Sequence, residues 1–468
     1  MLPEFLFATG VVFILGLAVW LLQALLKLFR SGKVNFQIPP DGEEELSATR
    51  TVFLFIIIAI ATGFPLWYLI AHLGWEAHVL DWLHLILRWF HVVIGIAWIG
   101  ASFYFIFLEN SLNRTEGLRD ELAGNLWAVH GGGFYYLEKY KTAPGALPKT
   151  LHWFKYEAYF TWISGIYLLF LVYYFHADAT LLDPQISNIK PDTAIFIGIG
   201  SIVLGWFLYD GLCRTPLISK TRWFAALGFL FLVGISWGLS QFLSGRAVFM
   251  HIGALLGTIM AGNVFFVIIP AQKALVRAAK AGLPPDPSRG KYAGLRSLHN
   301  NYTTLPVVFV MFSNHFPTTY GCSWNWVVLA LLILGSVSVR HFINLHEKGI
   351  SSFRLLGGAA ICLVLAIWLS APEVRKESLT AEHIEWKDVQ PIFQKRCVSC
   401  HADQPKDEVY KVAPAGARFE TWEQCQKTTS KILNRVVETK TMPQGNKTGM
   451  TDEERDLIAN WIAQGAKP

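Results

Sequence analysis

Long apolar runs are the feature that most constrains how this chain can fold. About 20 consecutive apolar residues are needed for a helix to cross the hydrocarbon of a bilayer. Of the 468 residues, 53% are hydrophobic and only 16% are charged. The runs long enough to cross are 5–26, 51–71, 82–108, 157–176, 193–213, 223–243, 248–270, 324–346 and 354–370. We therefore predict an all-α fold, in which residues 1–371 form a polytopic transmembrane helical bundle of about nine or ten spans.

A further apolar run, 302–316, is short and contains Pro306, Asn314 and His315. Loops on the cytoplasmic side of a membrane are rich in Lys and Arg, so charge indicates whether this run crosses. The loops rich in these residues are 27–50, 109–156, 214–222, 271–301 and 347–353, and the poor ones are 72–81, 177–192, 244–247 and 317–323. The two kinds alternate only if 302–316 crosses. This predicts about ten crossings, with both termini on the outer side.

Residues 372–468 have the composition of an ordinary soluble segment and carry a C-x-x-C-H motif, Cys397-Val398-Ser399-Cys400-His401. In such a motif the two thiols bond covalently to haem and the adjacent imidazole ligates the iron. We predict that this segment, called the tail below, is a small all-α cytochrome c domain with haem c. The predicted topology places it in the periplasm of a bacterial inner membrane.

The second axial ligand of such a haem must come from elsewhere in the tail. Met442 precedes a proline on a predicted loop, and a methionine ligand raises the potential above that of bis-imidazole ligation. Met450 is the alternative. We predict His401 and Met442 as the iron ligands.

Two helices are predicted around this motif. Residues 386–396 place Val389, Ile392 and Phe393 on one face, which predicts a short amphipathic helix. Residues 451–454 (TDEE) have the pattern of a capping box, which predicts a terminal helix from that point. Cys425 has no predicted partner.

Ionisable residues inside membrane helices are costly and therefore indicate function. In the run 82–108, His84, Arg88 and His91 have i, i+4 and i+7 spacing and share one face. With them, His251 and His315 fall in the outer half of the bilayer. We predict that two of the four histidines hold a haem b whose propionates lie near Arg88. The alternative is that these histidines are hydrogen-bonded packing residues.

Several stretches resemble the bacterial membrane-bound urate oxidases, which join a multi-span membrane domain to a C-terminal cytochrome c. These stretches are 130–135 (HGGGFY), 137–140 (LEKY), 156–159 (YEAY), 298–306 (LHNNYTTLP) and 313–315 (SNH). The resemblance implies oxidation of urate to 5-hydroxyisourate in purine catabolism. It also implies that electrons pass to cytochrome c, respiratory cytochromes and a terminal oxidase, without hydrogen peroxide.

A planar urate anion would suit a pocket with Arg, His and Asn side chains, which could bind it and accept a proton. From their predicted depth in the membrane and their spacing along the helices, we take three residues as candidate catalytic or propionate contacts: Arg88, Asn314 and His299.

Two other functions fit parts of the same pattern. An electron-transfer subunit would relay electrons from a quinol or a dehydrogenase to cytochrome c and bind no organic substrate. A transporter with a haem domain fits less well, because the sequence shows no internal repeat. The positive charge lies in membrane loops, so a nucleic-acid partner is not needed to explain it.

Overall fold

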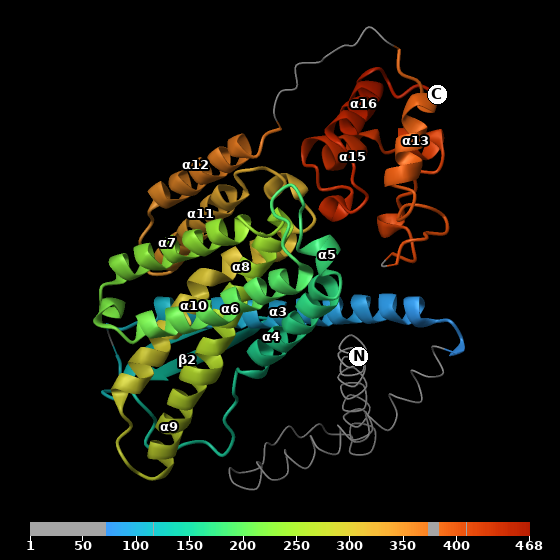
Figure 1. Cartoon of the computed structure of the whole chain (residues 1–468). Coiled ribbons are helices and arrows are strands. Elements are labelled where there is room, and N and C mark those ends of the chain that lie inside the picture. Colours follow the sequence, from blue (N-terminus) through green and yellow to red (C-terminus); the bar gives the residue numbers. More distant parts are fainter. Residues whose placement is uncertain (1–71, 116, 373–382, 409) are drawn as a thin grey trace.

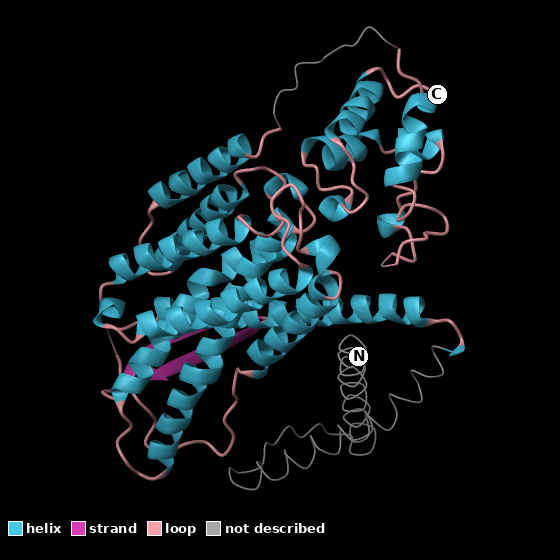
Figure 2. Ribbon diagram, viewed as in Figure 1, coloured by secondary structure: helices cyan, strands magenta, loops and turns pink. Residues whose placement is uncertain are grey.

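The computed structural model describes residues 72–115, 117–372, 383–408 and 410–468, and this part of the chain is mostly helical (Figures 1 and 2). The predicted spans 5–26 and 51–71 lie outside the described residues. In the bundle the elements are α3 (Glu76–Ser111), β1 (Leu122–His130), β2 (Gly133–Tyr140), α4 (Tyr156–Leu169), η1 (Phe170–Tyr174), α5 (Ala177–Thr180), α6 (Pro191–Cys213), η2 (Pro216–Ser219), α7 (Thr221–Ser240), α8 (Gly245–Gly262), η3 (Asn263–Ile268), α9 (Ile269–Lys280), α10 (Pro287–Ser313), η4 (Pro317–Thr319), α11 (Asn325–His346) and α12 (Phe353–Leu369).

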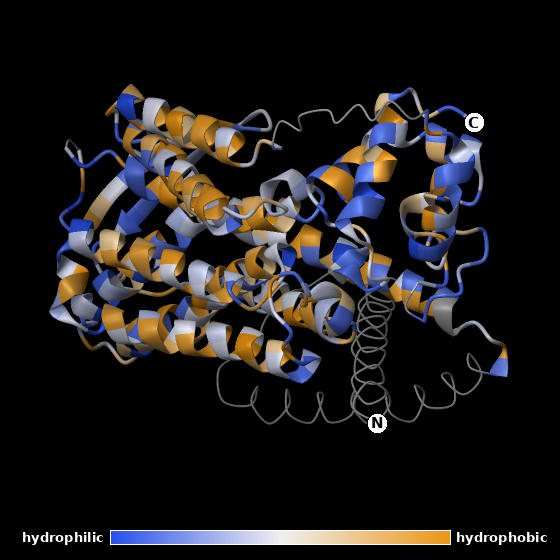
Figure 3. Cartoon of the chain, turned by 45° about the horizontal axis from the view of Figure 1, so that its top comes forward, coloured by the Kyte–Doolittle hydropathy of each residue, from blue (hydrophilic) through white to orange (hydrophobic). Residues whose placement is uncertain are grey.

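The helices confirm the prediction of a multi-pass membrane protein. Five helical segments are long and apolar enough to cross a bilayer: His78–Ser111, Pro191–Cys213, Thr221–Ser240, Gly245–Lys280 and Asn325–His346. The helix α12 is apolar but shorter. Large apolar side chains such as Phe196, Trp89 and Trp368 point outward from the bundle, as lipid contact requires. Figure 3 shows the hydrophobic residues as orange segments along the helices of the bundle.

The predicted short run 302–316 is the second half of a long helix. The helix α10 begins at Pro287 and continues to Ser313, with Pro306 inside it. Hydropathy misses its first half because that half contains Arg289, Lys291 and Arg296. A helix can nevertheless pass through the bundle there, because Arg296 is fully buried against a carboxylate of α6.

A two-stranded antiparallel hairpin, which was not predicted, lies in the loop between α3 and α4. Its strands β1 and β2 are joined by Gly131 and Gly132, both with positive φ. A two-residue turn of this kind matches the twist of the paired strands and favours glycine at both positions. The HGGG string is therefore the turn of a hairpin in this chain.

The centre of the bundle is α8, the most buried of the candidate spans, with 61% of its most apolar window inside the protein. Glycines on neighbouring helices permit this close packing. A Cβ at Gly198 of α6 would overlap the imidazole of His251, and one at Gly205 would lie 2.5 Å from Leu255. The helices α6 and α10 therefore pack tightly around α8.

The tail has a separate apolar core, in which Phe393, Ile458 and Trp461 are fully buried. Its elements are α13 (Trp386–Arg396), η5 (Pro414–Gly416), α14 (Trp422–Gln426), α15 (Thr429–Ile432), η6 (Leu433–Glu438), η7 (Gln444–Asn446) and α16 (Asp452–Ala463). Both predicted helices are confirmed, and Thr451 and Glu454 form the predicted capping box of α16. The division of the chain into domains at residue 371 stays a prediction.

The tail contacts the bundle at the end where α3 and α8 begin. The φ of Gly445 in η7 is +57°, and its backbone lies against the carbonyls of Asp178, Ala179 and Leu182 around α5. At a second contact, a Cβ at Gly321 would lie 2.6 Å from the Cβ of Thr439. We call this end of the bundle the tail-facing end.

Candidate functional site

The C-x-x-C-H residues occupy the turn that follows α13. Cys397 is the C-cap of this helix and is buried, whereas Cys400 and His401 are half-buried. Burial raises the pKa of the Cys397 thiol to about 12. The imidazole Nδ1 of His401 lies 3.0 Å from the carbonyl oxygen of Ala417. Such a bond fixes the ring and directs Nε2 outward, which is the geometry of an iron-ligating histidine. These residues therefore fit a covalent haem.

Two methionines lie near the tail core. Met450 is buried within it, and its N–H donates to Asn446 Oδ1 at 2.9 Å. Met442 is half-buried, and its carbonyl accepts a hydrogen bond from Arg455 Nη1 at 2.8 Å. Met442 is thus the less enclosed of the two. Its role as an iron ligand stays a prediction.

Where the tail meets the bundle, Arg246 is the centre of a polar cluster. The guanidinium lies over the ring of Tyr173, 5.2 Å from its centroid, and Nε donates to Asn314 Oδ1 at 3.3 Å. Tyr320 of the bundle and Tyr410 of the tail also interact with Arg246 electrostatically. No carboxylate forms an ion pair with Arg246 in the part of the chain that the structure describes. We call Arg246, Tyr173, Asn314, Tyr320, Tyr410 and Gln444 the junction cluster.

Two amide donors of the junction cluster lack a good acceptor. Asn314 Oδ1 accepts from Tyr173 Oη at 2.6 Å and from Arg246, so the amide nitrogen of Asn314 faces only the sulfur of Met250, at 2.9 Å. Thioether sulfur is a weak acceptor. In the tail, Gln444 Oε1 accepts from Tyr410 Oη at 2.5 Å, and its buried Nε2 has no hydrogen-bond partner.

The four candidate haem b histidines have different surroundings. His251 is fully buried, with Nδ1 2.7 Å from the carbonyl of Ala247 and Nε2 3.0 Å from the hydroxyl of Tyr174. His91 Nδ1 lies 2.9 Å from Ser164 Oγ. His315 is exposed, and His84 is half-buried. The contacts of His251 and His91 match the packing alternative, and the haem b stays a prediction.

Arg88, the predicted propionate contact, is exposed on α3. Further along α3, small residues face neighbouring helices. A Cβ at Gly95 would lie 3.9 Å from Thr161 of α4, and the carbonyl of Ser102 accepts from Asn301 of α10 at 3.5 Å. These small residues pack helices together.

His299 lies away from the junction cluster, in the first half of α10. Its ring stacks on Phe224 with centroids 4.8 Å apart, and Nδ1 lies 2.9 Å from the hydroxyl of Tyr209. Beside it, Arg296 donates to Asp210 Oδ1 at 2.5 Å and to Asn263 Oδ1 at 2.9 Å. The structure therefore does not bring the predicted contacts Asn314 and His299 together, because His299 lies near the middle of α10 and Asn314 just beyond its C-terminal end.

A second buried arginine, Arg340 of α11, lies over the ring of Phe103 at 3.8 Å, and its Nε donates to Asn301 Oδ1 at 2.8 Å. Its Nη2 lies 3.9 Å from a carboxylate oxygen of Glu347. Unlike Arg246, this arginine therefore has an acidic neighbour inside the bundle.

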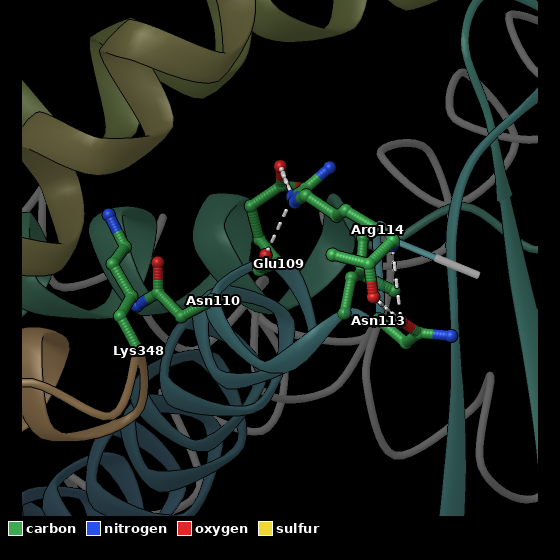
Figure 4. A pocket seen from close by; sticks show the side chains of 7 residues that line it. Glu109, Asn110, Asn113, Arg114 and Lys348 are labelled. Carbon is green, nitrogen blue, oxygen red and sulfur yellow. Dashed lines mark hydrogen bonds and ion pairs between the residues drawn. The ribbon is translucent and has the colours of Figure 1, made fainter.

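One hollow in the described structure, of about 460 Å³, lies at the C-terminal end of α3, and Figure 4 shows the side chains that line it. It is lined by Glu109, Asn110, Leu112, Asn113, Arg114, Thr115 and Lys348. Its carboxylate is already paired, because Glu109 accepts from Arg114 at 2.8 Å and also contacts Lys139. The carboxylate of the hollow is therefore compensated, whereas Lys348 forms no ion pair among the described residues.

Sequence reasoning identified Asn314 but missed Arg246, Tyr173 and Tyr410. One signal in the sequence could have identified this site. Arg246 is a single arginine directly before a long apolar segment, in a loop that is otherwise poor in basic residues.

Residues 77–371, more than half of the chain, match the protein family described as Urate oxidase N-terminal. The match ends before the tail. No curated protein and no solved structure was found to match this chain.

Proposed function

Because the chain belongs to the urate oxidase N-terminal family, we propose that it oxidises urate to 5-hydroxyisourate in purine catabolism and passes the electrons through haem to the respiratory chain. The family match over residues 77–371 is the observation that carries this proposal. The C-x-x-C-H geometry of the tail supports the electron route, which avoids hydrogen peroxide. The chain would lie in a bacterial inner membrane with its tail in the periplasm.

The chemistry balances without oxygen as a reactant. Urate and one water molecule give 5-hydroxyisourate, two electrons and two protons. Haem bound to the tail would supply a one-electron acceptor, so the electrons would leave one at a time to respiratory cytochromes and a terminal oxidase. Cys397 and Cys400 would hold this haem, and His401 and Met442 would ligate its iron.

The chain's own residues would bind the purine anion, orient it and accept its protons. A positively charged arginine beside hydroxyl and amide groups suits a planar anion. In the described bundle, Arg246 and Asn314 provide such groups on the side that contacts the tail.

An anaerobic visible spectrum of the purified oxidised protein, recorded before and after addition of urate, tests this function. We expect a reduced c-type band to grow with urate, and a b-type band beside it if a membrane haem is present. A spectrum that does not respond to urate, although dithionite still reduces the haem, would instead support an electron-relay subunit that binds no organic substrate.

A further inference from the structure

We propose that the junction cluster is the binding site of the urate anion, and that the tail completes this site. This inference names the substrate site of the function proposed above and rests on it. The bundle contributes Arg246, Tyr173, Asn314 and Tyr320, and the tail contributes Tyr410 and Gln444.

The first argument is a surplus of hydrogen-bond donors. The Arg246 guanidinium has no carboxylate partner among the described residues, Gln444 Nε2 is buried without an acceptor, and the Asn314 amide nitrogen faces a thioether. A buried donor without an acceptor is destabilising, because it loses its hydrogen bond to water and gains none in return. Gln444 Nε2 is such a donor, and the half-buried Arg246 and Asn314 add donors on the bundle side. Together these groups indicate a ligand that is rich in acceptors. Urate has three ring carbonyl oxygens and carries a negative charge at neutral pH.

The second argument is the shape and polarity of the surrounding side chains. The Arg246 guanidinium lies over the ring of Tyr173, 5.2 Å from its centroid, and the Tyr320 hydroxyl donates to the backbone carbonyl of Asn314 at 3.3 Å. Aromatic rings offer flat surfaces to a planar heterocycle. By contrast, the buried Arg296 is paired with Asp210 at 2.5 Å, and Arg340 has the carboxylate of Glu347 at 3.9 Å, although its Nη1 and Nη2 have no hydrogen-bond partner. An anion at either site would lie close to an acidic side chain.

The third argument is the position of the cluster beside the haem-attachment loop. The N–H of Asp407 donates to the carbonyl of Ser399, inside the C-x-x-C-H motif, at 3.0 Å. The N–H of Tyr410 in turn donates to Asp407 Oδ1 at 3.1 Å. A ligand that contacts Tyr410 would therefore lie one short loop away from Cys400 and His401. Electrons could pass directly from such a ligand to the tail.

Equilibrium dialysis of urate against the full-length, dithionite-reduced holoprotein tests the site without turnover, because reduced haem cannot accept electrons. We expect Arg246→Gln to raise the Kd for urate at least about tenfold, since hydrogen bonds to charged groups are worth roughly 1.5–3 kcal/mol. Arg246→Lys should have a smaller effect, because it keeps the charge but loses the planar fork.

Asn314→Asp is the sharper variant. It keeps the shape of the side chain and places a carboxylate 3.3 Å from Arg246 Nε, at the position of the present amide oxygen. This new ion pair should neutralise the site and weaken urate binding as much as Arg246→Gln does. Arg354→Gln removes an exposed arginine at the start of α12 and should leave the Kd unchanged. Equal haem content in all variants would show that they fold.

Wild-type Kd values in Arg246→Gln and Asn314→Asp would overturn the inference. So would a change in the haem midpoint potential of Arg246→Gln with unchanged urate binding, because the anion at Arg246 would then be a haem propionate. The two proposals fail separately. If the reduced protein binds urate through Arg246 but the oxidised protein never oxidises it, the binding site is supported and the proposed activity is wrong.

Discussion

Arg296 of α10 and Asp210 of α6 form a buried ion pair, with Nη2 and Oδ1 2.5 Å apart, at the end of the bundle away from the tail. The Arg296 side chain is fully buried, and Asn263 and Tyr292 accept further hydrogen bonds from it. The pair joins two helices that both pack against α8. It also explains how α10 can carry an arginine into the bundle.

Removing one partner of this pair should destabilise the bundle strongly. We expect Asp210→Leu to lower the free energy of unfolding by about 3–5 kcal/mol, because Arg296 would remain as an uncompensated buried charge. Thermal unfolding in detergent, followed by circular dichroism, measures this. Arg214→Gln, which removes the exposed second partner of Asp210, should change stability by only about 0.5 kcal/mol. Equal melting temperatures for the two variants would contradict the assignment.

Docking of the tail on the bundle should depend on Gly445. In Gly445→Ala the new Cβ would lie 3.1–3.2 Å from three backbone carbonyls around α5. We expect faster hydrogen exchange of the amides of residues 177–182 and slower reduction of haem by urate. Gly465→Ala is the matched control, because Gly465 also has positive φ but has nothing within 4 Å. Both variants carry a backbone strain of about 1–2 kcal/mol, so identical exchange in the two would show that Gly445 does not hold the tail.

The two methionines of the tail should respond differently to substitution. Met442→His should lower the midpoint potential of the tail haem, because bis-imidazole ligation stabilises the oxidised iron relative to imidazole–thioether ligation. Met450→Leu conserves volume in the core and should leave the potential unchanged, with a loss of stability below about 1.5 kcal/mol. A potentiometric titration followed in the visible range separates the two. The reverse result would identify Met450 as the ligand.

The tail should lose stability in acid through Glu454. Burial raises the pKa of this carboxyl, but hydrogen bonds from Arg396, at 2.9 Å from both carboxylate oxygens, hold it below its usual value. The folded tail therefore binds a proton less readily than the unfolded chain does. This contribution is complete above the unfolded pKa of about 4.3 and is lost as the pH falls through the lower, folded pKa. Glu454→Gln should flatten the acid limb of a plot of melting temperature against pH. An unchanged limb would show that other carboxyls control acid unfolding.

Particular residues show why the sequence predicted some elements and missed others. The apolar runs 193–213 and 324–346 correspond closely to α6 and α11, because lipid contact demands continuous apolar surface. The first half of α10 was missed because the charge of Arg296 is compensated only by a residue 86 positions away in the chain. The hairpin was missed although the two glycines at 131 and 132 are a turn signal.

The candidate site was predictable only in part for a similar reason. Asn314 could be identified as a polar residue in an apolar run. That its partners are Arg246, from another helix, and Tyr410, from the tail, depends on tertiary contacts between segments that are distant in the chain.

The length of α10 makes lipid thickness a variable for this protein. Its 27 residues extend over about 40 Å, more than the roughly 30 Å of hydrocarbon in a typical bilayer. Arg296 ties the first half of this helix to α6, and Asn314 lies just beyond its C-terminal end. A thinner or thicker bilayer would change the hydrophobic mismatch along this helix, which contacts within the bundle hold in place. Contacts within the protein therefore set the position of Arg246 and Tyr410, and this position does not adjust when the thickness of the bilayer changes.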